Sequence, residues 1–107
     1  MITKPTTSRP SYWRPDVEAN TTKQLVSSAC ELSYIKLSSG SGAAVVELYD
    51  AASAGEANST AFRFLLDCST TDNDTNQFVD PLKFERGIYA KLVQGAGYNP
   101  TICFSII

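Results

Sequence analysis

Histidine is absent from all 107 residues, and its absence removes most of the acid–base chemistry that a small protein could carry out. A serine–histidine–aspartate triad, a histidine-ligated zinc ion and proton transfer by imidazole are all excluded. Paired carboxylates are the remaining option, but nothing in the spacing of the acidic residues brings two of them together over a substrate. The acidic residues considered are Glu47, Asp50, Asp67 and Asp80. We therefore predict solvated strand ends rather than an active site, and no enzymatic activity.

The segment Asp72-Asn73-Asp74-Thr75-Asn76 places oxygen ligands at alternate positions, as the first half of a calcium-binding loop does. The match then fails, because Gln77 stands where such a loop needs glycine and Lys83 stands where it needs a bidentate glutamate. A turn in which Asp and Asn side chains bond to their own backbone accounts for the segment. We predict no metal site here.

Two Gly-x-Gly elements, Gly40-Ser41-Gly42 and Gly95-Ala96-Gly97, have the spacing that begins a phosphate-binding loop. Neither is followed by the third glycine, the Lys-Ser/Thr pair or the helix that a phosphate cradle requires. Both precede segments typical of strands. We therefore predict that they are hairpin turns and that the chain binds no cofactor.

The three cysteines, Cys30, Cys68 and Cys103, form an odd set without the Cys-x-x-Cys spacing of metal and redox sites. Each lies in an apolar stretch, where a free cysteine behaves as a small buried hydrophobe. The first residues lack the regions of a secretion signal, and no apolar run approaches the roughly 20 residues that span a bilayer. We expect a soluble protein, made in a reducing compartment, that does not bind membranes.

Apolar and polar residues alternate with a period of two from residue 21 onward, which indicates half-buried strands. In the segment 44–50, for example, Val46 and Leu48 share one face while Glu47 lies on the other. The expected strands are 23–29, 31–37, 44–50, 62–67, 78–84, 88–93 and 102–107. The Ala-rich stretch 50–61 is predicted as loop. We predict an all-β fold, an antiparallel β-sandwich or jelly roll, as one domain over residues 21–107.

Residues 1–20 differ from the rest of the chain, with prolines at positions 5, 10 and 15 that favour an extended path. The residues up to Arg14 carry three basic side chains and no acid. The other 93 residues carry six basic and eleven acidic side chains, a net charge of −5. We predict an extended N-terminal arm outside the sandwich. Binding to nucleic acid is not expected, because the acidic body would repel a phosphate backbone.

Tyr12-Trp13-Arg14 is the cluster in this arm best suited to contact another molecule. It holds the only tryptophan of the chain, in a segment with no local core to bury it. Tryptophan, tyrosine and arginine dominate protein–protein hot spots. We predict that the cluster docks on a neighbouring chain; the alternative is that the arm folds back and Trp13 covers its own sandwich.

Four apolar or aromatic residues fall on strand faces opposite the expected core: Val45, Tyr49, Tyr89 and Val93. On a monomer they would form an exposed apolar patch, and such patches usually mark interfaces. We therefore predict a homo-oligomer that buries this sheet face, with a trimer as one candidate.

The stretch Leu32-Ser33-Tyr34-Ile35-Lys36-Leu37, a Gly-Ser turn and the strand Val45-Val46-Glu47-Leu48-Tyr49-Asp50 resemble a pattern found in small tailed-phage virion proteins. The later stretch Phe84-Glu85-Arg86-Gly87-Ile88-Tyr89-Ala90-Lys91-Leu92 is similar to the same pattern. In those proteins a hairpin ending in Leu-Tyr-Asp precedes a Gly-Ile/Leu-Tyr strand near the C-terminus. The resemblance covers residues 30–107 and leaves out the arm.

The resemblance implies a non-enzymatic virion protein, made in the host cytoplasm, of the capsid decoration (cement) type. Its partners would be other copies of itself and the major capsid protein, or another virion protein. A head–tail connector or tail component is an alternative within the family. An alternative of another class is a glycan-binding β-sandwich module that grips a sugar with Trp13, Tyr89 or Tyr98.

Overall fold

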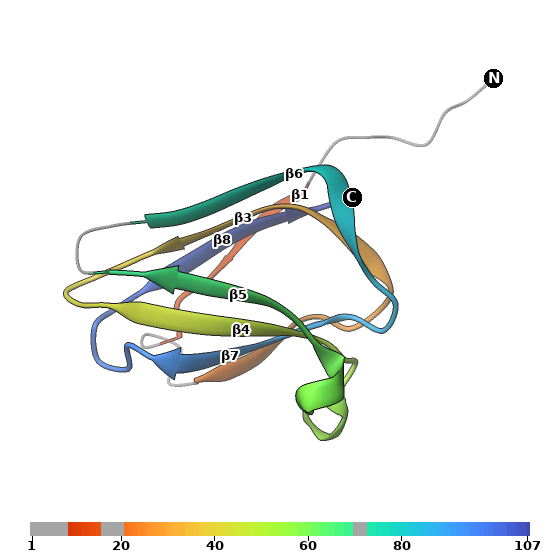
Figure 1. The fold of residues 1–107 in the computed structure, drawn as a ribbon, viewed down its shortest axis with the longest axis horizontal. Coiled ribbons are helices and arrows are strands. Elements are labelled where there is room, and N and C mark those ends of the chain that lie inside the picture. The colour runs from red at the N-terminus through yellow and green to blue at the C-terminus, as the bar shows by residue number, and fades with distance from the viewer. Residues whose placement is uncertain (1–8, 16–20, 70–72) are drawn as a thin grey trace.

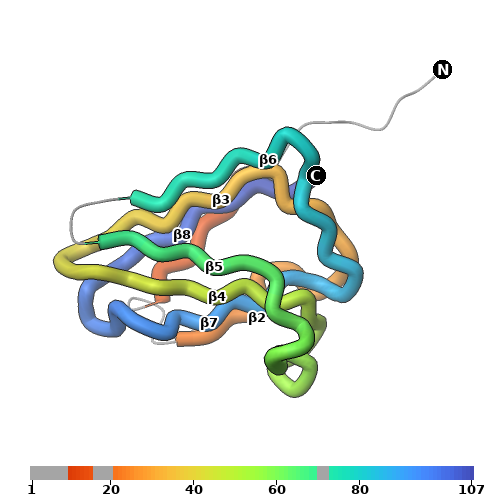
Figure 2. The backbone as a smooth tube through the Cα atoms, viewed as in Figure 1, coloured from red at the N-terminus to blue at the C-terminus, as the bar shows by residue number. Residues whose placement is uncertain are grey.

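The computed structural model describes residues 9–15, 21–69 and 73–107, which form a sandwich of two four-stranded antiparallel sheets (Figures 1 and 2). Sheet A has the strand order β1-β8-β3-β6 and sheet B the order β2-β7-β4-β5. The strands of sheet A are β1 (Arg9–Trp13), β8 (Thr101–Ile106), β3 (Cys30–Ser38) and β6 (Asn73–Phe84). Those of sheet B are β2 (Thr22–Val26), β7 (Ile88–Gln94), β4 (Ala44–Asp50) and β5 (Phe62–Cys68).

Consecutive strands lie in different sheets at every step except from β4 to β5, which pair with each other in sheet B. This strand order is that of a jelly roll, in which two Greek keys wrap around one core. The prediction of an all-β, jelly-roll-like sandwich is confirmed. The stretch predicted as loop between β4 and β5 holds two turns of 3₁₀ helix, η1 (Ala54–Glu56) and η2 (Ser59–Ala61).

The core lies between the sheets and is built by the period-two alternation of the strands. Side chains at every second position point inward and are buried, whereas their neighbours face outward. The largest fully buried apolar side chains of the strands are Trp13, Leu32, Ile35, Leu37, Val46, Leu48, Leu66, Phe84, Ile88 and Ile102. Burying one such side chain contributes about 1.5–3 kcal/mol, so this shared core holds the two sheets together.

Strand β1 corrects the prediction of a free N-terminal arm. Arg9–Trp13 pairs with β8, with Trp13 opposite Ile102, and the indole is 0% exposed. The predicted contact of Trp13 with a neighbouring chain is therefore wrong, and the sandwich includes β1 rather than beginning at residue 21. The physical reason is that the large apolar indole covers one edge of the core, while β1 pairs with a strand that would otherwise have an open edge. Residues 1–8 and 16–20 of the predicted arm lie outside the described residues.

The two glycine-rich turns connect different sheets and are not the predicted hairpins. Residues 40–42 lie between β3 and β4, and residues 95–97 lie between β7 and β8. The hairpin of the phage-like pattern is wrong for the same reason, since its two strands belong to sheets A and B. The turns pack against each other, with the Ser41 N–H donating to the Tyr98 carbonyl at 2.8 Å. A Cβ on Gly42 would lie 2.4 Å from the Tyr98 ring, so a larger residue there would have to displace that ring.

Side chains join the edges of the two sheets at β5 and β6. Arg63 donates to a backbone carbonyl of β6 at 3.0 Å, and the Asp74 carboxylate accepts from the Asp67 N–H at 2.9 Å. Between them the rings of Phe64 and Phe78 meet edge to face, with centroids 5.4 Å apart. These contacts occupy backbone groups that open edges would offer to another strand.

Replacing Trp13 with alanine should lower the free energy of unfolding by about 3–5 kcal/mol, because it leaves a cavity in the core. Tyr12→Ala is the matched control, since Tyr12 is 63% exposed on the same strand. It should cost less than about 1 kcal/mol. Urea unfolding followed by circular dichroism measures both variants, and equal effects would contradict the burial of Trp13.

Candidate functional site

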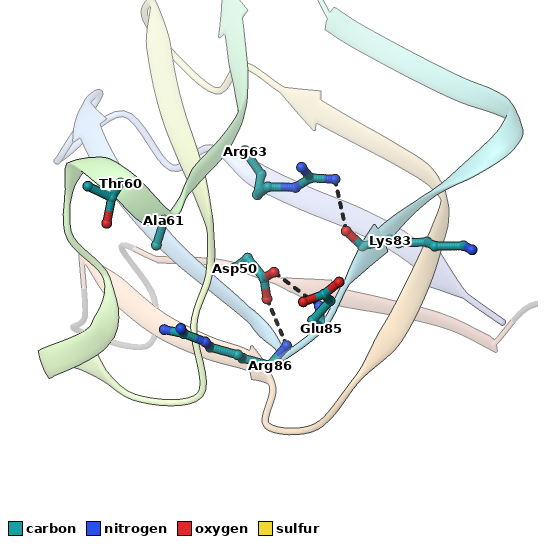
Figure 3. Close-up of a pocket in the computed structure, with 7 residues that line it drawn as sticks. All are labelled: Asp50, Thr60, Ala61, Arg63, Lys83, Glu85 and Arg86. Carbon is teal, nitrogen blue, oxygen red and sulfur yellow. Dashed lines mark hydrogen bonds between the residues drawn. The ribbon is translucent and has the colours of Figure 1, made fainter.

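The carboxylate of Asp50, the last residue of β4, holds the turn in which the chain passes from β6 to β7. Its two oxygens accept hydrogen bonds from the backbone N–H groups of Glu85 (3.1 Å) and Arg86 (2.8 Å), as Figure 3 shows. Gly87 follows with a φ of 149°, which side chains rarely adopt. A Cβ there would also lie 2.3 Å from the Val26 carbonyl oxygen. An acid and a glycine therefore fix the path of this turn.

The same contacts set the pKa of Asp50. Partial burial acts to raise this pKa, but hydrogen bonds from the N–H groups of Arg86, Glu85 and Gly87 favour the ionised carboxylate. The positive charge of Arg63 adds to their effect, and the pKa of Asp50 lies below its ordinary value. An ionised carboxylate that binds backbone N–H groups acts in the fold rather than as a proton donor.

A polar pocket of about 340 Å³ opens beside Asp50. Its lining includes the cationic side chains of Arg63, Lys83 and Arg86, together with Glu85. In Figure 3 the side chains of Lys83 and Arg86 point in opposite directions away from Asp50, while Arg63 reaches the Lys83 carbonyl. The cations therefore do not converge on one point where a phosphate or carboxylate could bind.

Gln24 ties β2 to the same end of the sandwich. Its amide nitrogen lies 2.8 Å from the Val26 carbonyl oxygen, 2.6 Å from that of Ala51 and 3.2 Å from that of Ile88. Neither Gln24 nor the cations of the pocket were predicted as site residues. No local pattern marks them, because the Gln24 contacts with Ala51 and Ile88 reach across 27 and 64 residues of sequence.

The four carboxylates considered for catalysis lie in four separate places. Glu47 accepts a hydrogen bond from the Tyr49 hydroxyl at 2.7 Å on the outer face of sheet B. This bond is the main reason that the pKa of Tyr49 is raised to about 12, with burial and the Glu47 charge adding to it. Asp67 is exposed near the end of β5, Asp80 is exposed on β6, and Asp50 holds its turn.

Tyr12 and Arg14 are the members of the predicted arm cluster that remain at the surface. The Arg14 guanidinium lies 5.4 Å from the centroid of the Tyr12 ring, within the range of a cation–π contact. Because Trp13 points inward, the cluster is divided between the core and the outer face of sheet A.

The predicted sheet-face interface is also divided. Tyr49 and Tyr89 are each 8% exposed, because Ala51 and Ala57 of the β4–β5 connection pack over their rings. The prediction that these two tyrosines contact another chain is therefore wrong. Val93 remains 58% exposed and Val45 half-buried on the uncovered part of the same face.

Lys91 holds this connection on the sheet. Its ammonium group donates to the Ala57 carbonyl at 2.9 Å and lies 4.6 Å from the centroid of the Tyr49 ring. The cover over the two tyrosines is thus fixed by a hydrogen bond and a cation–π contact as well as by packing.

The calcium-like segment uses its carboxylate within the fold. Asp74 accepts from the Asp67 N–H at 2.9 Å and from the Asn76 amide at 3.0 Å. Asp72 of the same segment lies outside the described residues. Among the residues that the structure describes, no group of three or more His, Cys, Asp or Glu side chains could hold a metal ion.

The three cysteines are free thiols that differ in their surroundings. Cys68 is buried in the core, as predicted, and Cys30 is half-buried at the start of β3. Cys103 alternates with the inward-facing Ile102 and Phe104, so its predicted place in the core is wrong. Burial raises the pKa of Cys30 to about 11, with the charges of Asp50 and Glu31 adding to the effect.

The fold and the site together define an eight-stranded jelly-roll protein, over the described residues, whose polar side chains hold its connections. Comparison of the chain with protein-family models and with curated proteins finds no match. Within the part of the chain that the structure describes, no helix has the length and apolarity needed to cross a membrane.

Asp50→Asn should lower the free energy of unfolding by about 1–3 kcal/mol at neutral pH, because an amide nitrogen cannot accept the N–H bonds that a carboxylate accepts. The pKa of Asp50 is depressed in the folded protein. Its stabilisation is therefore present above the pKa of the unfolded chain and is lost as the pH falls through the folded pKa. The difference in the free energy of unfolding between wild type and variant should therefore become smaller at acidic pH.

Glu85→Gln is the matched control, because Glu85 is exposed in the same turn. Urea unfolding of the three proteins at neutral and acidic pH measures these differences. A gap between wild type and Asp50→Asn that stays constant down to acidic pH would argue against the carboxylate as its source.

Cys30 should react slowly with iodoacetamide in the native protein at mildly alkaline pH, because a pKa of about 11 leaves little thiolate. Unfolding in urea should accelerate its reaction. Peptide mass spectrometry after timed quenching measures the rate at Cys30 separately from the other cysteines. Equal native and unfolded rates would show that the thiol is not shielded.

Proposed function

We propose that the chain is a non-enzymatic structural protein of a virion, a decoration (cement) protein that binds a phage capsid and other copies of itself. The observation that carries the proposal is the jelly-roll strand order, an architecture that viral capsid domains use. The phage-like stretches at residues 32–50 and 84–92 add a likeness of sequence only, because β3 and β4 do not form the hairpin of that pattern. The main support comes from the architecture of the fold, which lectin domains share.

The chemistry of the described side chains also favours a structural role. Three groups that could perform acid–base or nucleophilic work contribute to the fold instead. Asp50 binds the backbone of the β6–β7 turn, Asp74 joins β5 to β6, and the Cys30 thiol is held protonated. Asp50 and Asp74 connect parts of the chain that belong to different sheets, and Cys30 lies near Asp50.

A glycan-binding module, the alternative of another class, loses two of the three rings on which it depends. Trp13 lies in the core and Tyr89 lies beneath the β4–β5 connection, so neither can stack on a sugar. Tyr98 remains partly exposed, with its ring packed over Gly42. A single remaining ring does not favour this alternative over the virion role.

Particles of the virus that encodes this chain should contain it. Peptide mass spectrometry of density-gradient-purified particles should find it at a fixed ratio to the major capsid protein, because a decoration protein occupies repeated positions on the shell. Antibody labelling in the electron microscope should place it over the head, whereas labelling at the neck or tail would favour the connector or tail alternative.

An abundant non-virion protein of the infected cell is the control, and its peptides should disappear during purification. The proposal would be overturned if the chain were abundant in the lysate but absent from the purified particles.

A further inference from the structure

Three aliphatic side chains lie side by side on the uncovered part of the outer face of sheet B, and they are termed the outer strip: Leu65 of β5, Val45 of β4 and Val93 of β7. Leu65 is 45% exposed, Val93 is 58% exposed and Val45 is half-buried. Val45 pairs with Gln94, the neighbour of Val93, and Leu65 lies opposite Glu47, two residues from Val45 on the same face. At these spacings the three side chains are neighbours across three strands.

The outer face of sheet A differs in kind over the residues that the structure describes. Its paired outward positions hold small or polar side chains and two tyrosines, and Val79 of β6 is a lone exposed aliphatic residue. Two adjacent rows across the sheet are Tyr12, Cys103, Lys36 and Thr75, and Pro10, Ser105, Tyr34 and Gln77. Because exposed aliphatic residues are grouped on the outer face of sheet B and single on sheet A, the face of sheet B is the better candidate for a contact surface.

Glu47 and Lys91 border the outer strip with opposite charges. They lie opposite each other on β4 and β7, the two central strands of sheet B. Glu47 uses one carboxylate oxygen for the Tyr49 hydroxyl, and Lys91 uses one ammonium donor for the Ala57 carbonyl. Both groups retain hydrogen-bonding capacity for a further partner.

We propose that two copies of this chain pack with their outer strips in contact, about a two-fold axis that runs along the strands between β4 and β7. The axis places β4 of one copy against β7 of the other, because these strands are the centre of sheet B. Val93 then meets Val45 of the partner copy, and Lys91 meets Glu47 of the partner copy. This inference rests on the proposed function, and it identifies the surface through which copies of the chain would assemble.

A second copy fits this surface because the surface is complementary to itself under that rotation. Val45 meets Val93 and each cation meets an anion, while Leu65 lies over Thr22 of β2 of the partner copy. A two-fold axis across the strands would instead place Lys91 against Lys91 and Glu47 against Glu47, which repel. The connection over Tyr49 and Tyr89 confines the contact to the other half of the face, so the interface is small. We expect a dissociation constant on the order of micromolar.

Val93→Asp tests the apolar part of the contact, and Val79→Asp is its matched control. Val79 is 98% exposed on β6 of the other sheet, so both variants place the same charge on an exposed strand position. Analytical ultracentrifugation of the full chain should show a dimer whose dissociation constant rises at least about tenfold in Val93→Asp. Val79→Asp should leave it unchanged.

Reversing the charge of Glu47 or Lys91 tests the proposed two-fold arrangement of the dimer. Glu47→Lys alone and Lys91→Glu alone should each be monomeric, because each places like charges across the axis. An equimolar mixture of the two variants should dimerise, because every cation then meets an anion of the other variant. Circular dichroism checks that each variant is folded, and Val93→Asp decides the question where a charge variant does not fold.

A wild-type chain that stays monomeric, a Val93→Asp chain that dimerises like wild type, or a variant mixture that fails to associate would each overturn the inferred contact. Failure of the proposed function gives a different result. In that case the chain dimerises through the outer strip but is absent from purified particles. If the chain is present in particles and the Val93→Asp variant dimerises like wild type, the proposed function stands and the inferred contact is wrong.

Discussion

The bond between the Asp50 carboxylate and the β6–β7 turn is the polar interaction that fixes how the chain crosses from one sheet to the other. The turn carries the chain from sheet A to sheet B, and it lies between two core residues, Phe84 and Ile88. Asp50 ends β4, so its carboxylate joins a central strand of one sheet to the strand that leaves the other. Gln24 adds β2 to the same point through the Ala51 and Ile88 carbonyls. Four strands therefore meet at one small set of polar contacts.

The positions of most strands could be predicted from the sequence, whereas β1, the first half of β6 and the pairing of the strands could not. Alternation is a local property, and it predicted the bounds of β4 and the inward faces of β7 and β8. Pairing depends on contacts between distant segments, as when Trp13 near one end of the chain lies opposite Ile102 near the other. Turn chemistry did not help, because glycine-rich turns such as residues 40–42 serve crossings between sheets as readily as hairpins. The tryptophan was misplaced because its strand partner cannot be read from nearby residues.

The outward-facing residues show the same limit. Alternation correctly placed Tyr49 and Tyr89 on the outer face of sheet B, but it could not show that the Ala-rich connection covers them. Alanine carries little signal in a sequence, yet its small size lets Ala51 and Ala57 approach the rings closely. Leu65 was not named as a surface residue because its contribution appears only once β5 is paired with β4. The pocket beside Asp50 had no sequence signal, since its walls come from β4, η2, β5, β6 and the β6–β7 turn.

The cover over the tyrosines also determines how much apolar surface sheet B presents. Without the connection held by Lys91, the whole outer face from the tyrosines to Val93 would be open, and a large apolar patch favours irreversible association. With it, the two tyrosines are covered, and the smaller apolar surface that remains limits a contact between two copies to a weak one. Weak contacts suit a protein that takes repeated positions on a surface, because many of them act together once the copies are held side by side. The same connection that makes the predicted tyrosine interface impossible therefore leaves a smaller contact whose strength fits the proposed role.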